Sequence, residues 1–179
     1  MPLARSWTEE LIAQYLEWKG FLIITDKKIG QGSKGGREDI DIVALDPAKK
    51  EIKLVNVTNT WSRKYEKIAE KTCNNLSKAE QCIRKKYGNA YTYTKELILI
   101  CYEKEAKSNV IKAEVIKINP KVQVTTLDEY ISKIVDEMRK HRAKTMETLP
   151  ENLYLLKLLE FMIDEKSSVK LKNKKALRE

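Results

Sequence analysis

Hydrophobic and polar residues alternate along two neighbouring segments in the first third of the chain. Residues 40–45 read IDIVAL, and after the short segment 46–50 a similar pattern resumes over 52–59, IKLVNVTN. A period of two predicts two β-strands joined by a five-residue loop. Because both faces of this pair are largely apolar, we expect other parts of the protein to cover the strands on both sides.

Asp41 is the exception in this apolar pattern. A buried carboxylate costs several kcal/mol unless it meets a cation, a metal ion or hydrogen-bond donors. Pairing Leu45 with Ile52 across the loop brings Asp41 opposite Asn56, although a shift of one residue would move Asn56 to the other face. Asp41, Asn56 and Thr58 then form a polar cluster, which we interpret as a candidate site. The alternative is a structural carboxylate paired with Arg37 or a lysine.

The other elements follow from periodicity, caps and breakers. They are, in order, a helix from Ser6 or Thr8 to Gly20, a strand over 21–25, a loop rich in Gly and Lys over 27–36, a helix over 62–87, a central strand over 96–102, an edge strand over 110–118, a strand over 122–125, a helix over 126–144 that starts with a capping box, and an apolar helix over 152–163. This order predicts an α/β sandwich, with a central mixed sheet flanked by helices and a C-terminal helical extension.

Length and composition predict one main domain. A chain of 179 residues with 42% hydrophobic content can bury one substantial core. We expect this domain at 1–144, a C-terminal helix within 145–165 and a basic tail at 166–179. Nothing in the chain indicates a small-molecule cofactor, because the loop at 27–36 lacks the Gly-Lys-Ser/Thr ending of a phosphate-binding loop.

The formal charge of +9 favours a polyanionic partner, above all nucleic acid. A basic surface can also be simply solvated, so charge does not decide the partner by itself. The basic residues that we expect to contact nucleic acid flank the alternating segments; they are Lys34, Arg37, Arg63, Lys64, Lys67 and Lys71.

Cysteine usage and hydropathy predict a cytoplasmic protein. The three cysteines do not pair evenly and lack metal-ligand spacing, so we expect free thiols in a reducing compartment. No apolar run approaches 18 residues, and the N-terminus lacks the apolar region of a signal peptide. We therefore expect no membrane partner.

The order of motifs resembles the PD-(D/E)XK nuclease superfamily, in particular Holliday-junction resolvases and restriction-endonuclease-like proteins. The resemblance covers about residues 6–135. Glu9 stands eleven residues before Gly20-Phe21, as the helix glutamate of the family does, and the segment from Asp41 to Ala44, DIVA, is similar to the second motif. The family fold is a helix-flanked mixed sheet, which agrees with the predicted elements.

This resemblance implies a catalytic site formed by Glu9, Asp41, Asn56 and Thr58. In the family, acidic residues hold one or two divalent ions that polarise the scissile phosphate, and a lysine orients or deprotonates the attacking water. The implied metal ligands are Glu9, Asp41 and Asn56, and the implied ion is Mg²⁺ or Mn²⁺. The third motif departs from the family, because Asn56 and Thr58 occupy the positions of Glu/Gln and Lys. Asparagine brings no charge, and threonine cannot replace an ammonium group.

Two other sources could supply the missing lysine. The segment Glu51-Ile52-Lys53 spells Glu-x-Lys, but it lies beside the loop, about 10–13 Å along the strand from Asp41, and Lys53 points to the face opposite Asn56. The second source is the following helix, where Lys64 or Lys67 is nearest. Both alternatives stay open at the level of the sequence.

Three hypotheses for function follow. The first is a protein that binds nucleic acid, above all DNA, with a nuclease-like fold whose phosphodiesterase activity is reduced or lost. The second is an active Mg²⁺-dependent DNA endonuclease with a variant site. The third is a non-catalytic subunit that binds other proteins, in which the apolar helix Leu153 to Ile163 is the docking element or the homodimer interface.

Overall fold

The computed structural model describes residues 6–31, 37–60, 64–101, 105–145 and 148–163. The chain divides into two compact units, Met1–Tyr130 and Ile131–Glu179. The first unit contains the whole sheet and every described residue of the candidate site. The second unit contains most of the last long helix and a short helix at 154–163.

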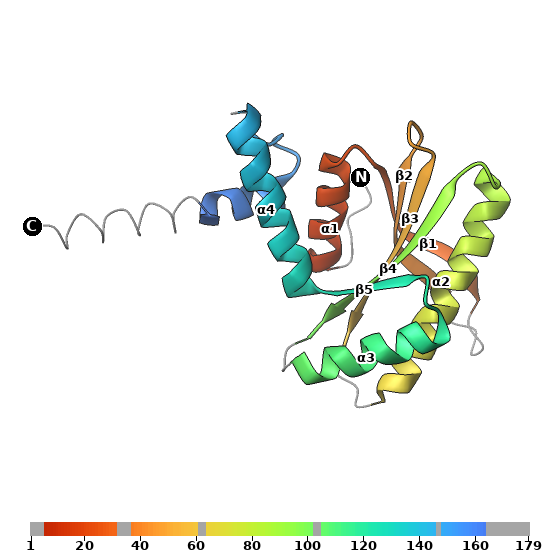
Figure 1. The fold of residues 1–179 in the computed structure, drawn as a ribbon. Helices are drawn as coiled ribbons and strands as arrows, with labels where there is room; N and C mark the ends of the chain where they lie inside the picture. The colour runs from red at the N-terminus through yellow and green to blue at the C-terminus, as the bar shows by residue number, and fades with distance from the viewer. Residues whose placement is uncertain (1–5, 32–36, 61–63, 102–104, 146–147, 164–179) are drawn as a thin grey trace, which may run out of the picture. The chain divides into compact units, whose positions relative to one another are not determined.

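A five-stranded sheet is the centre of the first unit (Figure 1). Its strands are β1 (Leu22–Gln31), β2 (Arg37–Asp46), β3 (Glu51–Asn59), β4 (Thr92–Ile100) and β5 (Val122–Thr126). They lie side by side in chain order. β1, β2 and β3 pair antiparallel, whereas β3, β4 and β5 pair parallel. The predicted α/β architecture with a mixed sheet is confirmed.

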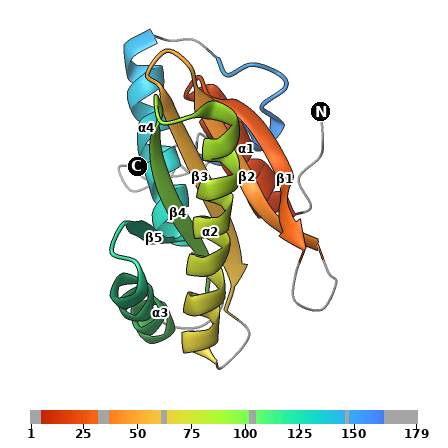
Figure 2. The ribbon, with the colours of Figure 1, turned by 90° about the vertical axis from the view of Figure 1, so that its right-hand side faces the viewer.

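Helices cover both faces of this sheet (Figures 1 and 2). They are α1 (Trp7–Trp18), α2 (Tyr65–Tyr87) and α3 (Glu105–Ile118), whereas α4 (Leu127–Thr145) follows β5 and lies mostly in the second unit. α1 packs on β1 and β2, while α2 and α3 pack together on the other face. Parallel neighbours need long crossover connections, and α2 and α3 are the crossovers from β3 to β4 and from β4 to β5.

The hydrophobic core has one layer on each face of the sheet. On the α2 side, Leu54 and Leu97 of the sheet pack with Leu76 of α2 and Ile111 of α3 in one buried cluster. On the α1 side, the helix buries the stripe Leu11, Ile12, Tyr15 and Leu16. The predicted cover on both faces of the hairpin is therefore present.

Both caps predicted for helices are formed. The side chain of Ser6 accepts a hydrogen bond from the Glu9 N–H at 3.3 Å and so begins α1. At α4, the Glu129 N–H donates to Thr126 Oγ1 at 3.3 Å, and the Thr126 N–H donates to Glu129 Oε2 at 2.8 Å. This reciprocal pair is the predicted capping box.

The predicted edge strand at 110–118 is wrong, because this segment belongs to α3. Ile111 and Val115, four residues apart, are fully buried, whereas Ile116 and Ile118 are exposed. Branched apolar residues occur in both strands and helices, and the short segment 110–118 is compatible with the periodicity of either. The parallel pairing of β4 with β5 requires a crossover here, and the helix provides it.

β1 is longer than predicted. The segment 27–31, expected as part of a loop, continues the strand as far as Gln31 by pairing with the first residues of β2. Pairing with a neighbour, rather than local propensity, decides this stretch. The rest of the expected loop, 32–36, and the basic tail at 166–179 lie outside the described residues. Within the described part of the chain, no helix is both long and apolar enough to cross a membrane.

Candidate functional site

The register of the β2–β3 hairpin places Asp41 as predicted. Leu45 pairs with Ile52, and the ladder continues to Ile42 and Val55. The paired residues end there, so the predicted register is confirmed up to the residues next to Asp41 and Asn56. Here Asp41 Oδ2 accepts a hydrogen bond from the backbone N–H of Val57 at 2.6 Å. Where the pairing of β2 with β3 ends, the Val57 N–H therefore donates to the side chain of Asp41 and not to a backbone carbonyl of β2.

The regular alternation of β2 is interrupted at Asp41. Ile40 and Val43 lie in the same core cluster although they are three residues apart, whereas strict alternation would put them on opposite faces. In β1, the residue between the partners of Ile42 and Ile40 is Asp26, which has a φ of 50°. Aspartate is one of the few residues that adopt this left-handed conformation readily. The irregularity in both strands takes Asp41 out of the regular pleat.

Asp41 is partly buried among other acidic residues. Burial, the largest cause, raises the pKa of Asp41 from its ordinary value of 3.8 to about 7, and the hydrogen bond from Val57 opposes this shift. Glu9, Asp26 and Asp39 raise the pKa further by repulsion. The charged side chains with the largest effect on Asp41 are thus all acidic. They come from α1, β1 and β2, and Glu9 among them is the partner implied by the family resemblance.

Asn56 and Thr58 are joined to each other. Asn56 Nδ2 donates to Thr58 Oγ1 at 2.9 Å, and Asn56 is only 8% exposed. The link from these residues to Asp41 is the backbone N–H of Val57, which lies between them in the chain. The polar cluster therefore surrounds one stretch of β3, and its contact with Asp41 is through the main chain.

The described side chains do not form a ready-made metal site. Among the residues that the structure covers, no group of three or more His, Cys, Asp or Glu side chains could hold a metal ion. Asn56 uses its amide nitrogen toward Thr58, and Asp41 uses one carboxylate oxygen toward the backbone. No catalytic step through Mg²⁺ or Mn²⁺ follows from this arrangement, and the metal stays a prediction.

The alternative Glu-x-Lys segment lies away from Asp41, in an ion-pair group of its own. Lys53 Nζ is 3.1 Å from Glu96 Oε1 and 3.5 Å from Glu51 Oε1, and it also lies over the ring of Phe21. These contacts fix the ammonium group near the hairpin loop. These ion pairs and the ring contact therefore give Lys53 a structural role, without a role in a site at Asp41.

The other predicted basic residues are placed as follows. Lys34 and Arg63 lie outside the described residues, and so does the side chain of Arg37, which begins β2. A pairing of Arg37 with Asp41 therefore stays untested. Lys64 is the N-cap residue of α2, and Lys67 and Lys71 are exposed on its first two turns.

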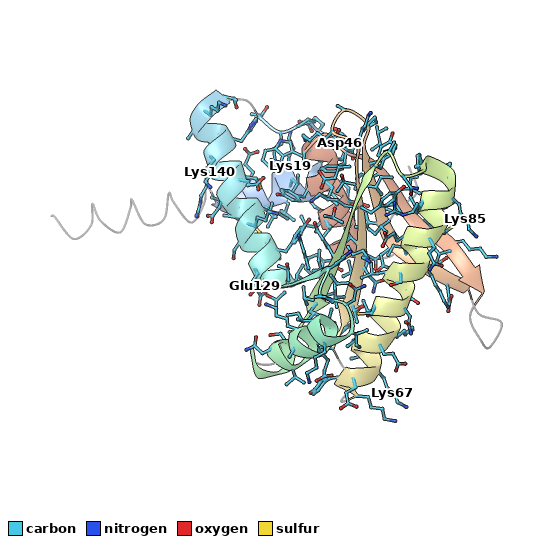
Figure 3. The ribbon with its side chains drawn as sticks, turned by 45° about the vertical axis from the view of Figure 1, so that its right-hand side comes forward. Lys19, Asp46, Lys67, Lys85, Glu129 and Lys140 are labelled. Atoms are coloured by element: carbon cyan, nitrogen blue, oxygen red, sulfur yellow. The ribbon has the colours of Figure 1, made fainter. Side chains whose placement is uncertain are left out.

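The exposed lysines of α2 continue past Lys71, the last residue predicted to contact nucleic acid. Lys67, Lys71, Lys78 and Lys85, which we call the lysine stripe, are all exposed. At about 100° per residue, they fall within about 40° of one another around the helix, opposite the buried residues Leu76 and Ile83. The stripe spans about 27 Å along the helix axis, and Figure 3 shows its first and last members, Lys67 and Lys85, on the two ends of α2.

The spacing of four, seven and seven residues could have revealed this stripe in the sequence, since each interval is close to a whole number of helical turns. In the folded protein, Lys78 pairs with Glu38 of β2 at 2.9 Å, and both groups are near the surface. Such exposed pairs contribute little to stability and exchange readily.

Comparison with known proteins adds little to this geometry. No protein-family model and no curated protein matches the chain. The crystal structure of a protein of unknown function, AF1548, is similar with a TM-score of 0.40 and 19% sequence identity. The match covers 66% of this chain and 55% of the other, so this chain corresponds to about half of that protein.

The arrangement has two chemically distinct parts. The acidic cluster around Asp41 repels anions and attracts cations, whereas the lysine stripe attracts anions. The stripe lies on the solvent side of α2, the helix that leads away from β3.

Proposed function

We propose that this protein binds DNA through the lysine stripe of α2 and has a nuclease-like acidic site whose phosphodiesterase activity is reduced or lost. The observation that carries this proposal is the single line of four exposed lysines along one helix. Each ammonium group can neutralise a phosphate and release a counterion, which makes binding favourable at low salt. Contacts of this kind position a nucleic acid without reading its sequence.

The length of the stripe suits an extended polyanion. Its span of about 27 Å equals the rise of about eight base pairs at 3.4 Å each. Lys67, Lys71 and Lys85 form no ion pair within the described part of the chain, and Lys78 is 52% exposed in its pair with Glu38. Little would have to be broken for these lysines to contact phosphate.

The acidic cluster supports the reduced-activity part of the proposal. Glu9 and Asp41 interact, as the family pattern implies. Asn56 and Thr58 supply neither the second acidic ligand nor the ammonium group of the third motif. A hydrolytic site without these groups loses charge stabilisation of the transition state.

An active metal-dependent nuclease is the second candidate. The observation that favours it is the repulsion that Glu9, Asp26 and Asp39 exert on Asp41, which a divalent cation would relieve. Cleavage of DNA in Mg²⁺ or Mn²⁺ that disappears in Asp41→Ala would establish this candidate in place of the first.

The lysine stripe is tested by salt-dependent binding. Replacing Lys67, Lys71, Lys78 and Lys85 together by Gln should weaken binding to a labelled duplex and reduce the slope of log K against log salt by about 3–4, since each lost phosphate contact contributes about 0.9. A matched control replaces four exposed lysines outside the stripe, Lys28, Lys121, Lys140 and Lys144, by Gln. An equal loss of DNA affinity in both variants would mean that net charge alone determines binding, which would contradict the proposal.

A wild-type protein that binds no nucleic acid would favour the protein-interaction hypothesis. The helix at 154–163 exposes four large apolar side chains, Tyr154, Leu158, Phe161 and Met162, and could then form the docking or homodimer surface. We keep the cytoplasm as the proposed location, because the three cysteines are free thiols.

A further inference from the structure

The turn between α2 and β4 gathers aromatic and cationic side chains. The guanidinium carbon of Arg84 lies 4.2 Å from the ring centroid of Tyr93. The ring centroids of Tyr87 and Tyr91 are 6.0 Å apart, with an angle of 71° between the planes. We call Arg84, Tyr87, Tyr91 and Tyr93 the tyrosine–arginine cluster. All four are partly exposed.

Hydrogen bonds hold this cluster in place. The two terminal nitrogens of Arg84 donate to Asn89 Oδ1 at 2.9 Å and to Glu80 Oε1 at 2.7 Å. The Tyr93 hydroxyl donates to the carbonyl oxygen of Gly88 at 2.7 Å and thereby ties the strand to the turn. A surface fixed in this way loses little conformational entropy when a ligand binds.

The three tyrosines also pack against the hydrophobic core, so each is only partly exposed. Arg84 bonds the turn residue Asn89, and Tyr93 bonds Gly88, whereas Tyr87 and Tyr91 form an additional aromatic pair beside them. Lys86 lies 5.1 Å from the Tyr87 ring centroid and adds a positive charge at the surface. The side chain of Arg84 is still 39% exposed, although it covers Tyr93. The exposed part of the rings and the positive charge therefore remain available to a ligand.

Planar side chains beside cations suit unpaired nucleobases. Aromatic rings and the guanidinium plane of arginine stack on bases, while nearby ammonium groups hold the phosphates. Bases inside a duplex do not expose their faces in this way. The cluster also adjoins the lysine stripe, because Lys85, the last lysine of the stripe, is the neighbour of Arg84 in the chain, at the end of α2 marked by Lys85 in Figure 3.

We propose that the tyrosine–arginine cluster stacks an unpaired nucleobase, so that the ligand class is DNA with a single-stranded segment next to a duplex. The lysine stripe would hold the duplex backbone, and the cluster would receive the first unpaired base beyond it. This inference rests on the proposed DNA binding. It adds a preference for unpaired nucleotides, which the stripe alone would not produce.

The test compares two labelled DNAs that differ only in a short single-stranded extension. Wild-type protein should bind the extended duplex about fivefold or more tightly than the blunt duplex, as expected for stacking of one base. Tyr91→Leu should remove this difference and leave binding to the blunt duplex unchanged. Tyr91→Phe, which keeps the ring, should retain the difference. Arg84→Lys keeps the charge but loses the plane, and should reduce the difference.

A fluorescent base provides a second readout that a purely structural role would not move. Aminopurine placed as the first unpaired base should lose fluorescence when wild-type protein binds, because stacking on an aromatic ring quenches it. Unchanged fluorescence, or equal binding of both DNAs by the wild type, would overturn the inference while the proposed DNA binding stands. If Tyr91→Leu does not fold, the fluorescence change with wild-type protein and the binding difference measured for Arg84→Lys test the inference instead. Absence of binding to either DNA at low salt would overturn both proposals.

Discussion

Asp41 makes the stability of this protein depend on pH. Its pKa is about 7 in the folded protein and near 3.8 in the unfolded chain, because burial and the neighbouring acids disfavour its charge. Between these two values the folded protein binds a proton that the unfolded chain has lost. The stability that protonated Asp41 contributes is therefore fully present below about pH 4 and is lost as the pH rises toward 7.

Asp41→Asn should remove most of this dependence. The amide oxygen of Asn can still accept the hydrogen bond from Val57, and the side chain carries no charge at any pH. We expect the variant to be more stable than the wild type by about 1–3 kcal/mol at pH 8 and nearly equal to it at pH 4.5, because the pKa of Asp41 rises from 3.8 to about 7 on folding. Urea unfolding at several pH values measures this, and parallel profiles for the two proteins would contradict it.

Asn56 and Thr58 can be converted to the residues that the family resemblance implies. Asn56→Glu combined with Thr58→Lys adds a carboxylate and an ammonium group beside the backbone that binds Asp41. We expect Mg²⁺ to raise the melting temperature of this double variant by several degrees and to leave that of the wild type nearly unchanged, since ligand binding stabilises only the state that binds.

The control for this experiment adds Asp41→Ala to the double variant. Removal of the central carboxylate should abolish the effect of Mg²⁺ on the melting temperature. An equal response of the double variant and the triple variant would mean that the ion acts elsewhere.

At the scale of elements, α2 is joined to β4 by a charged pair in the core. Lys95 Nζ lies 2.8 Å from Glu80 Oε2, and the side chains are 9% and 24% exposed. Glu80 also pairs with Arg84, whereas Lys95 has Glu80 as its partner in the described structure. Without Lys95, Glu80 therefore keeps an ion pair with Arg84, whereas without Glu80, Lys95 loses its partner.

We expect Glu80→Ala to cost more stability than Lys95→Met. Removing Glu80 leaves a buried ammonium group without a partner, which costs about 3–5 kcal/mol, while removing Lys95 leaves Glu80 with Arg84. Urea unfolding of both variants at neutral pH provides the comparison. A larger loss in Lys95→Met would show that the contribution of the Lys95 stem to packing exceeds that of its charge.

The elements that the sequence predicted correctly are those decided by local signals. The alternation of residues and the length of the loop predicted the register of the hairpin. The capping box predicted the start of α4. The segment of α3 was assigned wrongly because its apolar residues fit a strand and a helix equally well. The second half of β1 was missed because its partner in β2, and not its own residues, makes it a strand.

The candidate site was predictable to a similar extent. The positions of Asp41 and Asn56 followed from the hairpin, and Glu9 followed from the resemblance. Asp26 and Asp39 were missed. Asp26 had no strand assignment from which its neighbours could be read, and the break in alternation at Asp41 depends on the conformation of β1 and β2 together.

At the scale of the whole molecule, the acidic cluster stands against a basic net charge. The net charge is +9, yet the charged side chains with the largest effect on Asp41 are acidic groups of α1, β1 and β2. The lysine stripe and the tyrosine–arginine cluster both belong to α2, its connection to β4 and the start of β4. The described residues that we assign to DNA binding, together with the acidic cluster, all lie in the unit Met1–Tyr130.

The irregular conformation at Asp26 has a consequence for self-association. β1 is an outer strand of the sheet, and a long regular edge is a template on which strands of other molecules can assemble. A left-handed residue in the middle of β1, followed by Lys27 and Lys28, interrupts the row of backbone donors and acceptors and adds charge beside it. The feature that takes Asp41 out of the pleat therefore also makes this open edge a poor starting point for aggregation.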